Sequence, residues 1–406
     1  MTNIFRTSIG FLILIRVWFL QIALKSKNIY LTKDSDHYIE LSEDINYFFF
    51  NDNLIDYWLS TFRLPGYPVV LNIFSNFLDI KYAVYINFVA DLVTLFLLYK
   101  LLSMYFESTF TYIGCIIFLT NTNILISSTQ IMTESLSTML LVASYYYFKN
   151  QRYFFSGIFI ALLSIFKPLG IYLIIIYVLL LIFENKNFTK KILKLIILPV
   201  ILISGIYVNN LIQYESGFYS TSSYFHLQWF NNASESICKN YDFNNLNVSE
   251  PGYAFENWLE MEGLSKTSES KILIESLKTD ANNNLFKNIH CKAISMIRSS
   301  IWNMFGIRRA SWTGVGFNSI TLNFIIYFSL IYVVIINSIF IISIYKSLKN
   351  RKINSYIIVI LLYVLITSTL PFGNSRTRVL IEPLLIVTFI DSVKNIISNR
   401  LNESNL

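Results

Sequence analysis

Long apolar runs, each of about twenty residues with hardly a charge, recur along most of this chain. A helix of that length crosses roughly 30 Å of hydrocarbon at about 1.5 Å per residue. The pattern predicts an all-α polytopic membrane protein. We expect about ten transmembrane helices, near residues 8–24, 82–102, 110–127, 133–148, 153–166, 169–183, 192–211, 320–345, 353–370 and 379–396.

Two apolar stretches need separate interpretation. The run from Ile9 to Leu24 is similar to a secretory signal, but it contains Arg16 and lacks a small-residue cleavage site, so we interpret it as a retained first span. The stretch 68–78 is too short to cross a bilayer as a helix. We therefore expect it to be re-entrant or to lie at the membrane interface.

Composition agrees with a membrane protein. The chain is 54% hydrophobic and only 14% charged, and its mean hydropathy is +0.51. This balance excludes an ordinary soluble domain. The net charge of +7 indicates no nucleic-acid partner, because an excess of Lys and Arg in cytoplasmic loops is what orients such a protein.

The basic residues also predict the topology. If the N-terminus is cytoplasmic, every basic connector falls on the cytoplasmic side, as in the bacterial inner membrane. The predicted organisation is an N-terminal transmembrane module 1–211 with a first outer loop 25–81, an extracytoplasmic loop domain 212–319, and C-terminal transmembrane helices 320–406. The active face would then be periplasmic or extracellular.

The first outer loop is rich in polar and aromatic residues. Residues 36–50 fit an amphipathic helix at the interface. Asp34 lies at its expected start, where a carboxylate is either a plain N-cap or a catalytic group. Asp36 is a second carboxylate close by, and the pair could share a divalent cation or present one general base.

Further charged residues stand at the outer ends of predicted spans. Glu134 is either an interfacial carboxylate facing water or a site residue, because a buried carboxylate at that depth is costly. The cations in the short outer connectors either contact lipid phosphates or form an anion site that faces the carboxylates. These cations are Arg63, Lys167, Arg376 and Arg378.

Five short motifs occur in a fixed order: Asp34-x3-Tyr38-x3-Ser42, Arg63-Leu-Pro-Gly-Tyr-Pro68, Thr133-Glu134-Ser135-Leu136, Lys167-Pro168 and Arg376-Thr-Arg378-x4-Pro383. In order and spacing the chain resembles bacterial GT-C-type glycosyltransferases related to protein O-mannosyltransferases and to the lipid A aminoarabinose transferase. The resemblance spans residues 8–396 in topology, and the motif from Arg63 to Pro68 is its most specific part. The chain departs from the family in showing two acids, Asp34 and Asp36, where one is expected.

The resemblance implies transfer of a sugar from a polyprenyl-phosphate donor at the extracytoplasmic face. The acceptor would be an envelope glycan, a lipid or a protein, and membrane lipid is a further partner. Asp34 would be the general base, with Asp36 as the alternative, and Glu134 would position the acceptor. Asp34 and Glu134 could also hold a divalent cation such as Mg²⁺ or Mn²⁺. The four cations Arg63, Lys167, Arg376 and Arg378 would bind the donor phosphate.

The outer region 212–319 is the one soluble-looking part. Apolar spacing predicts helices near 272–277 and 285–302, and Cys238 and Cys291 could form a disulfide there. Cys115 lies within a predicted span and is interpreted as packing, and His226 and His290 as structural.

Two other enzyme or transport functions stay open. One is a lipid-linked oligosaccharide polymerase or ligase, which also has a large outer loop and outer-face arginines. The other is a transporter or flippase of lipid-linked sugars, for which charged or broken helices near the middle of the bilayer are expected. In this sequence the acids and bases are predicted to cluster at helix ends instead.

Overall fold

The computed structural model describes residues 2–25, 30–43, 45, 62–184, 188–222, 224, 270–283, 289–305, 319–350, 353–368 and 378–403. The described chain is all-helical, and each of the ten predicted apolar segments is helical. The ten correspond to α1 (Thr2–Leu24), α6 (Val84–Ser103), α7 (Ser108–Thr120) with α8 (Thr122–Ser128), α9 (Glu134–Lys149), α10 (Tyr153–Phe166), α11 (Leu169–Glu184), α12 (Thr189–Tyr214), α18 (Ser319–Lys349), α19 (Ser355–Thr367) and α21 (Glu382–Glu403).

The remaining elements are shorter and lie between these segments. Helix α3 (Lys33–Glu43) starts three residues before the amphipathic helix predicted at 36–50. Helix α5 (Gly66–Ser75) and the 3-10 helix η2 (Ile80–Ala83) precede α6. Helices α15 (Ser270–Asn283) and α16 (Ile289–Phe305) confirm that the region 212–319 has helical parts.

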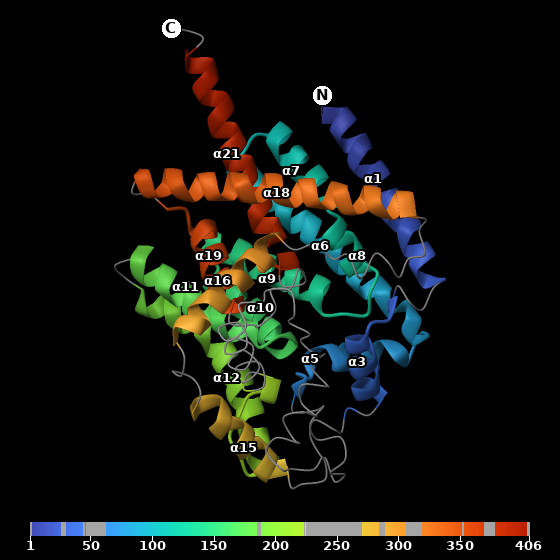
Figure 1. Cartoon of the computed structure of the whole chain (residues 1–406), viewed down its shortest axis with the longest axis vertical. Helices are drawn as coiled ribbons and strands as arrows, with labels where there is room; N and C mark the ends of the chain where they lie inside the picture. The colour runs from blue at the N-terminus through green and yellow to red at the C-terminus, as the bar shows by residue number, and fades with distance from the viewer. Residues whose placement is uncertain are drawn as a thin grey trace.

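The two chain ends lie at the same end of the molecule, and α3 and α5 lie toward the opposite end (Figure 1). Helix α18 crosses α21 and lies on the outside of the bundle, with much of its surface exposed (Figure 1). The helices α3 and α5 pack against each other, and α5 also packs against α10. The first outer loop is therefore attached to the helix bundle in the part of the chain that carries the predicted motifs.

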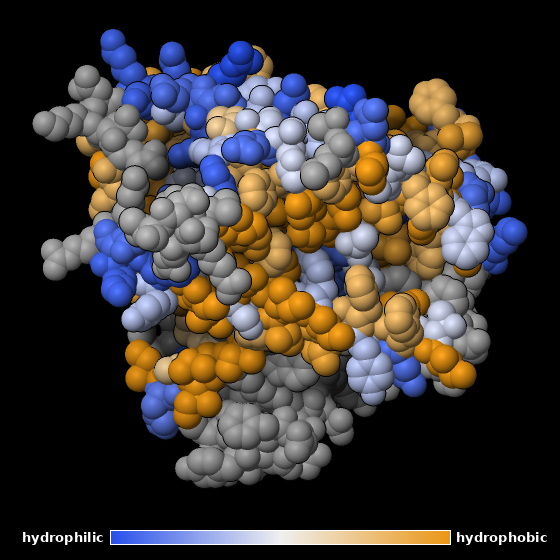
Figure 2. All heavy atoms as spheres, turned by 90° about the horizontal axis from the view of Figure 1, so that it is seen from above, coloured by the Kyte–Doolittle hydropathy of each residue, from blue (hydrophilic) through white to orange (hydrophobic). Residues whose placement is uncertain are grey.

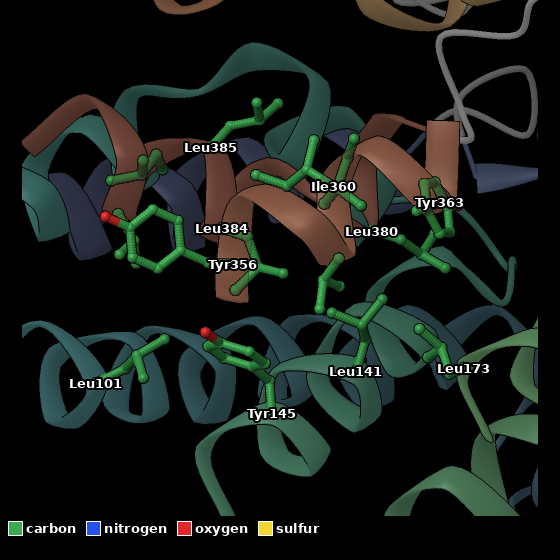
Figure 3. Close-up of a cluster of buried hydrophobic side chains, with 14 of the residues drawn as sticks. Leu101, Leu141, Tyr145, Leu173, Tyr356, Ile360, Tyr363, Leu380, Leu384 and Leu385 are labelled. Atoms are coloured by element: carbon green, nitrogen blue, oxygen red, sulfur yellow. The ribbon is translucent and has the colours of Figure 1, made fainter. Parts of the chain in front are cut away.

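The largest hydrophobic cluster forms between α9 and the C-terminal helices. Leu141 and Tyr145 on α9 face Leu384 on α21 and Tyr356 on α19 (Figure 3). Helix α10 packs closely on α12, because a Cβ at Gly157 would overlap the backbone oxygen of Leu195. Burial of these apolar side chains accounts for most of the packing between the helices.

One predicted span, 110–127, is not a single straight helix. It bends by 58° between α7 and α8. Asn121 sits at the break, where its Oδ1 accepts hydrogen bonds from the amides of Asn123 at 2.9 Å and Ile124 at 3.1 Å. An Asn side chain caps a new helix in this way, and the sequence pattern missed it because one polar residue barely changes an apolar run. The stretch 128–132, at the end of α8 and before α9, is fully buried.

Several apolar helices could span a membrane. Among the described residues, four helices are long and apolar enough, and the bent pair α7 and α8 would be a fifth. Three further apolar helices, α10, α11 and α19, are shorter. Apolar side chains form a broad band across one face, with hydrophilic side chains along its edge (Figure 2). The predicted number of ten spans goes beyond this finding.

Other sequence expectations fall partly outside the described residues. Among those outside are residues 47–50 of the predicted amphipathic helix, Arg376, Cys238 and His226. Cys291 is disulfide-bonded, whereas Cys115 is a buried free thiol, as expected for packing inside the bundle.

Candidate functional site

The start of α3 is capped by Thr32 rather than by Asp34. The Thr32 hydroxyl accepts from the amide of Ser35 at 3.2 Å, and the Ser35 hydroxyl accepts from the amide of Thr32 at 2.9 Å. This reciprocal arrangement is a capping box, which satisfies two amides at the helix start. The interpretation of Asp34 as a plain N-cap is therefore wrong.

Asp34 forms an ion pair with Arg63. The distance between Asp34 Oδ1 and Arg63 Nη2 is 2.6 Å, and the two side chains are 22% and 14% exposed. The guanidinium lies 4.9 Å from the ring centroid of Tyr38 and 5.0 Å from that of Phe62, within the range of cation–π contacts. Asp36, two residues on, is exposed to solvent. The geometry thus favours Asp34 over Asp36 as the carboxylate of a site.

His37 belongs to the same cluster. Its Nδ1 lies 3.3 Å from Arg63 Nη2, which makes Nδ1 the acceptor and leaves the ring proton on Nε2. Partial burial lowers the pKa of His37 below its usual 6.5, and the positive charge of Arg63 lowers it further, against the opposing effect of Asp34 and Asp36. A neutral imidazole is therefore the form that fits this cluster at neutral pH.

This lowered pKa predicts a pH dependence of stability. The folded chain binds a proton at His37 less well than the unfolded chain does. The stability that neutral His37 contributes is therefore fully present above pH 6.5 and is lost as the pH falls through the lower pKa of the folded chain. In melting curves from pH 7.5 to 5, we expect His37→Gln to lose part of the acid-induced decrease in Tm. An unchanged pH profile would remove His37 as its source.

The motif from Arg63 to Pro68 forms the start of α5. Pro65 occupies the N-cap of α5, and Pro68 lies in the first turn, where a missing amide proton costs no helical hydrogen bond. Leu64 and Tyr67 are buried. At Gly66 the backbone of α5 meets the end of α10, because a Cβ there would lie 2.6 Å from the carbonyl oxygen of Ile165. The motif thus places Arg63 beside α3 and fastens α5 to α10.

Replacement of Gly66 tests this contact. A methyl group at Gly66→Ala would overlap the backbone of Ile165 and the ring of Phe166, and rotation of a side chain cannot relieve the overlap with the backbone. We expect a loss of about 1–3 kcal/mol of stability, measured as a lower Tm of the detergent-solubilised chain. Gly10→Ala is the matched control, since no atom lies within 4 Å of a Cβ built there. Equal Tm values for the two variants would contradict the assigned packing.

Glu134 forms the second ion pair of the site. Its Oε1 lies 3.4 Å from Lys167 Nζ, and its side chain is 1% exposed. Glu134 starts α9, where the helix dipole favours a carboxylate. Lys167 follows the last residue of α10 and has an extended backbone, because a residue before proline disfavours the helical conformation. The chain then turns back so tightly that a Cβ at Gly170 would overlap the backbone of Ser164.

Tyr67 connects the two ion pairs. Its ring contacts Tyr38 at 5.2 Å between centroids and Phe166, the neighbour of Lys167, at 6.4 Å. Burial raises the pKa of Tyr67, and the nearby charge of Glu134 raises it further. The phenol therefore stays protonated beside the Glu134 carboxylate. The two acids and two cations of the predicted motifs thus belong to one neighbourhood.

The segment after α12 covers this neighbourhood. The Tyr219 hydroxyl donates to the backbone oxygen of Ser164 at 2.7 Å, and the Ser220 hydroxyl donates to that of Phe62 at 3.0 Å. The beginning of the outer region 212–319 thus contacts both the first outer loop and the end of α10.

Arg378 is placed differently from the other predicted cations. It is completely buried, its Nε donates to Glu382 Oε1, and its Nη1 donates to the backbone oxygen of Met304 on α16. Glu382 also accepts from Tyr332 at 3.3 Å. A hydrogen bond of 3.4 Å from Thr138, one turn after Glu134, to the backbone of Val379 brings this cluster close to the site. This buried position is typical of a residue that holds helices together, here α21 and α16.

The residues fit a divalent cation poorly. The two carboxylates predicted as metal ligands, Asp34 and Glu134, each already face a cationic side chain, which a metal ion would have to displace. Within the part of the chain that the structure describes, no three His, Cys, Asp or Glu residues gather as a metal site.

Sequence reasoning missed the interior charges. Arg16, noted only as a reason against a signal peptide, pairs with Asp91 on α6 at 3.1 Å, and both are at most 3% exposed. A charge within an apolar run was the signal that could have pointed to them, because such a residue needs a partner. The pair is an exception to the expectation that the acids and bases cluster at helix ends. The bend between α7 and α8 is a helix break that the sequence analysis did not predict.

Comparison of the chain with protein-family models, with curated proteins and with solved structures finds no match, so the resemblance described above rests on the motifs alone.

Proposed function

We propose that this chain transfers a sugar from a polyprenyl-phosphate donor to an acceptor glycan, lipid or protein at the extracytoplasmic membrane face, as GT-C-type glycosyltransferases do. One observation carries the proposal. The motif carboxylates Asp34 and Glu134, far apart in the sequence, each pair with a motif cation, and Tyr67 connects the two pairs. An acid beside a cation is what displacement of a phosphate leaving group requires.

The ion pairs suggest how the site acts. Without substrate, each carboxylate neutralises its cation, so no buried charge is left uncompensated. A donor phosphate competes with the carboxylates for Arg63 and Lys167, which frees Asp34 from its 2.6 Å contact. Asp34 then accepts the proton of the acceptor hydroxyl as the new carbon–oxygen bond forms. The bond between the anomeric carbon and the phosphate oxygen breaks, and the cations stabilise the charge on the phosphate.

The membrane topology belongs to the same proposal. Ten spans give an even number, which agrees with the location of both chain ends at one end of the molecule (Figure 1). The disulfide at Cys291 favours an oxidising compartment for the region 212–319. We therefore assign α3, α5 and this region to the extracytoplasmic side of a bacterial inner membrane.

A second candidate function is transport of a lipid-linked sugar. The interior ion pair of Arg16 with Asp91 and the bend between α7 and α8 favour it, since transporters use charged and broken helices inside the bilayer. Asp91 is, however, paired with Arg16, and Arg16 is further bound to backbone oxygens, so neither charge is exposed to a passing substrate. We rank transport below transfer for this reason.

Mass spectrometry of co-purified lipids tests the proposal. Wild type and Asp34→Asn are purified in mild detergent, incubated with cell-envelope extract and extracted again. We expect a polyprenyl-phosphate sugar to accumulate on Asp34→Asn and to be consumed by wild type. A polyprenyl-diphosphate oligosaccharide in its place would identify a polymerase or ligase. A bound donor that crosses vesicle membranes without chemical change would identify a transporter.

A further inference from the structure

A second polar network lies inside the bundle, beneath the proposed site. Arg16 on α1 uses all three of its guanidinium nitrogen atoms. Nη1 contacts Asp91, Nε donates to the backbone oxygen of Leu119 at 2.9 Å, and Nη2 donates to those of Phe118 at 3.1 Å and Asn121 at 3.5 Å. Neither pair member takes part in the proposed chemistry, so the network needs its own explanation.

Arg16 compensates for the break between α7 and α8. The last carbonyl groups of a helix have no partner within it, and inside an apolar bundle no water replaces that partner. At the end of α7, the oxygens of Phe118, Leu119 and Asn121 are the acceptors that Arg16 binds. A planar guanidinium suits several acceptors at once, and its positive charge is favourable at a helix C-terminus. Arg16 thus fixes the 58° bend.

Helix α6 holds the segment that follows the bend. Asn87, one turn before Asp91, donates to the backbone oxygens of Gln130 at 2.5 Å and Met132 at 3.0 Å. The hydroxyl groups of Ser128 and Ser135 lie near the Asp91 carboxylate. The amide of Ile131 donates to the backbone oxygen of Tyr30 at 2.9 Å, which ties the segment to the chain just before α3.

The end of this segment is Glu134. From the bend at Asn121 to Ser135, every residue except Thr122 and Leu125 is buried. A buried ion pair contributes little net stability compared with apolar residues of similar volume, so stability alone does not account for it. The Arg16–Asp91 pair does fix the geometry of the segment, because hydrogen bonds to its carbonyl oxygens form only within a limited range of distances and angles.

We propose that Arg16 and Asp91 are positioning residues for Glu134. Their ion pair fixes the bent segment between α7 and α9, and this segment holds the Glu134 carboxylate against Lys167 and near Tyr67. The role of Glu134 in sugar transfer rests on the function proposed above, whereas the geometric coupling between the ion pair and Glu134 does not.

The first experiment measures the coupling without any substrate. In the full-length chain in detergent, the double substitution Arg16→Met with Asp91→Leu replaces the pair by apolar side chains. Glu134→Gln is then introduced into wild type and into this double variant, and the Tm shifts are compared. Coupled sites give non-additive shifts, and independent sites give additive ones. We expect Glu134→Gln to lower the Tm in the double variant by less than half of its effect in wild type.

A matched control uses an exposed ion pair. Glu215 and Lys271 pair at 2.7 Å on the surface, with side chains 72% and 52% exposed. The double substitution Glu215→Gln with Lys271→Gln should leave the effect of Glu134→Gln on Tm unchanged. Additive shifts for the Arg16 and Asp91 variant, equal to those of this control, would overturn the proposal.

The second experiment measures transfer. Displacing a site residue by about 1 Å can cost about 10²-fold in rate, so we expect the double variant to lose about 10²-fold in kcat, with little change in the KM for donor. Arg16→Lys provides a second variant if the apolar pair does not fold, since it keeps the ion pair but cannot bind several carbonyls at once. It should fold and still lose kcat. Full activity of a folded variant would show that the pair has no positioning role.

The outcomes separate the two proposals. No sugar transfer by wild type, together with non-additive Tm shifts, would refute the proposed function and leave the geometric coupling in place. Sugar transfer by wild type, together with additive Tm shifts and an unchanged kcat in the double variant, would support the proposed function and refute the geometric coupling.

Discussion

Asp34→Asn is expected to lower the kcat of sugar transfer by about 10²- to 10⁴-fold, the usual contribution of a positioned general base. Asparagine keeps the shape of the side chain and its place on α3, but it cannot accept a proton. The donor KM should not rise, because the neutral amide no longer competes with the donor phosphate for Arg63. The measurement is a single-turnover assay in proteoliposomes, with the donor identified by mass spectrometry.

The control for this prediction is the neighbouring acid. Asp36 is exposed on the same helix, so Asp36→Asn removes a similar charge without touching the contact with Arg63. We expect its kcat to remain within about threefold of wild type, as for a surface substitution. A large loss with Asp36→Asn, together with normal transfer by Asp34→Asn, would reverse the assignment of the base.

Arg378→Leu is expected to destabilise the chain by roughly 3–5 kcal/mol, because it leaves the Glu382 carboxylate buried without its partner. The double substitution Arg378→Leu with Glu382→Leu removes both charges and should recover most of that loss. Thermal unfolding in detergent measures both variants. Recovery in the double variant would assign the pair a structural role in anchoring α21 to α16.

Lys167→Met provides the contrast to these variants. Lys167 is 18% exposed and faces the proposed donor site, so its loss should weaken donor binding more than the Arg378 variants do once those are folded. Binding is measured with the purified polyprenyl-phosphate sugar. If the folded double variant at Arg378 and Glu382 also fails to bind donor, Arg378 is a phosphate ligand as the sequence first predicted.

The positions of the helices could be predicted because long apolar runs have few alternatives. The boundaries of α10 match the expected 153–166, and α9 starts one residue from its predicted position. The bend at Asn121 could not be predicted, because it depends on a donor from another helix, Arg16, more than a hundred residues away in sequence. Periodicity describes one segment at a time and contains no information on such partners.

The site was predicted in its residue types but not in its pairing. Asp34 and Glu134 were expected to face cations, yet which acid meets which cation depends on how α5 packs against α3 and α10. The capping alternative for Asp34 was wrong because Thr32 and Ser35 form the cap. Arg378 shares a motif with site residues, but it lies in the interior with Glu382, which sequence order alone could not show.

The contact at Gly66 has a consequence for the size of the ligand. Arg63 and Lys167 are each within a few residues of the place where the backbones of α5 and α10 touch, so the main chain fixes the separation of their Cα atoms. Rotation of the two long side chains then sets how far apart the charged groups can lie. An anion held by both cations must fall within that range. The backbone contact thereby limits the size of the anion without a side chain dedicated to that choice.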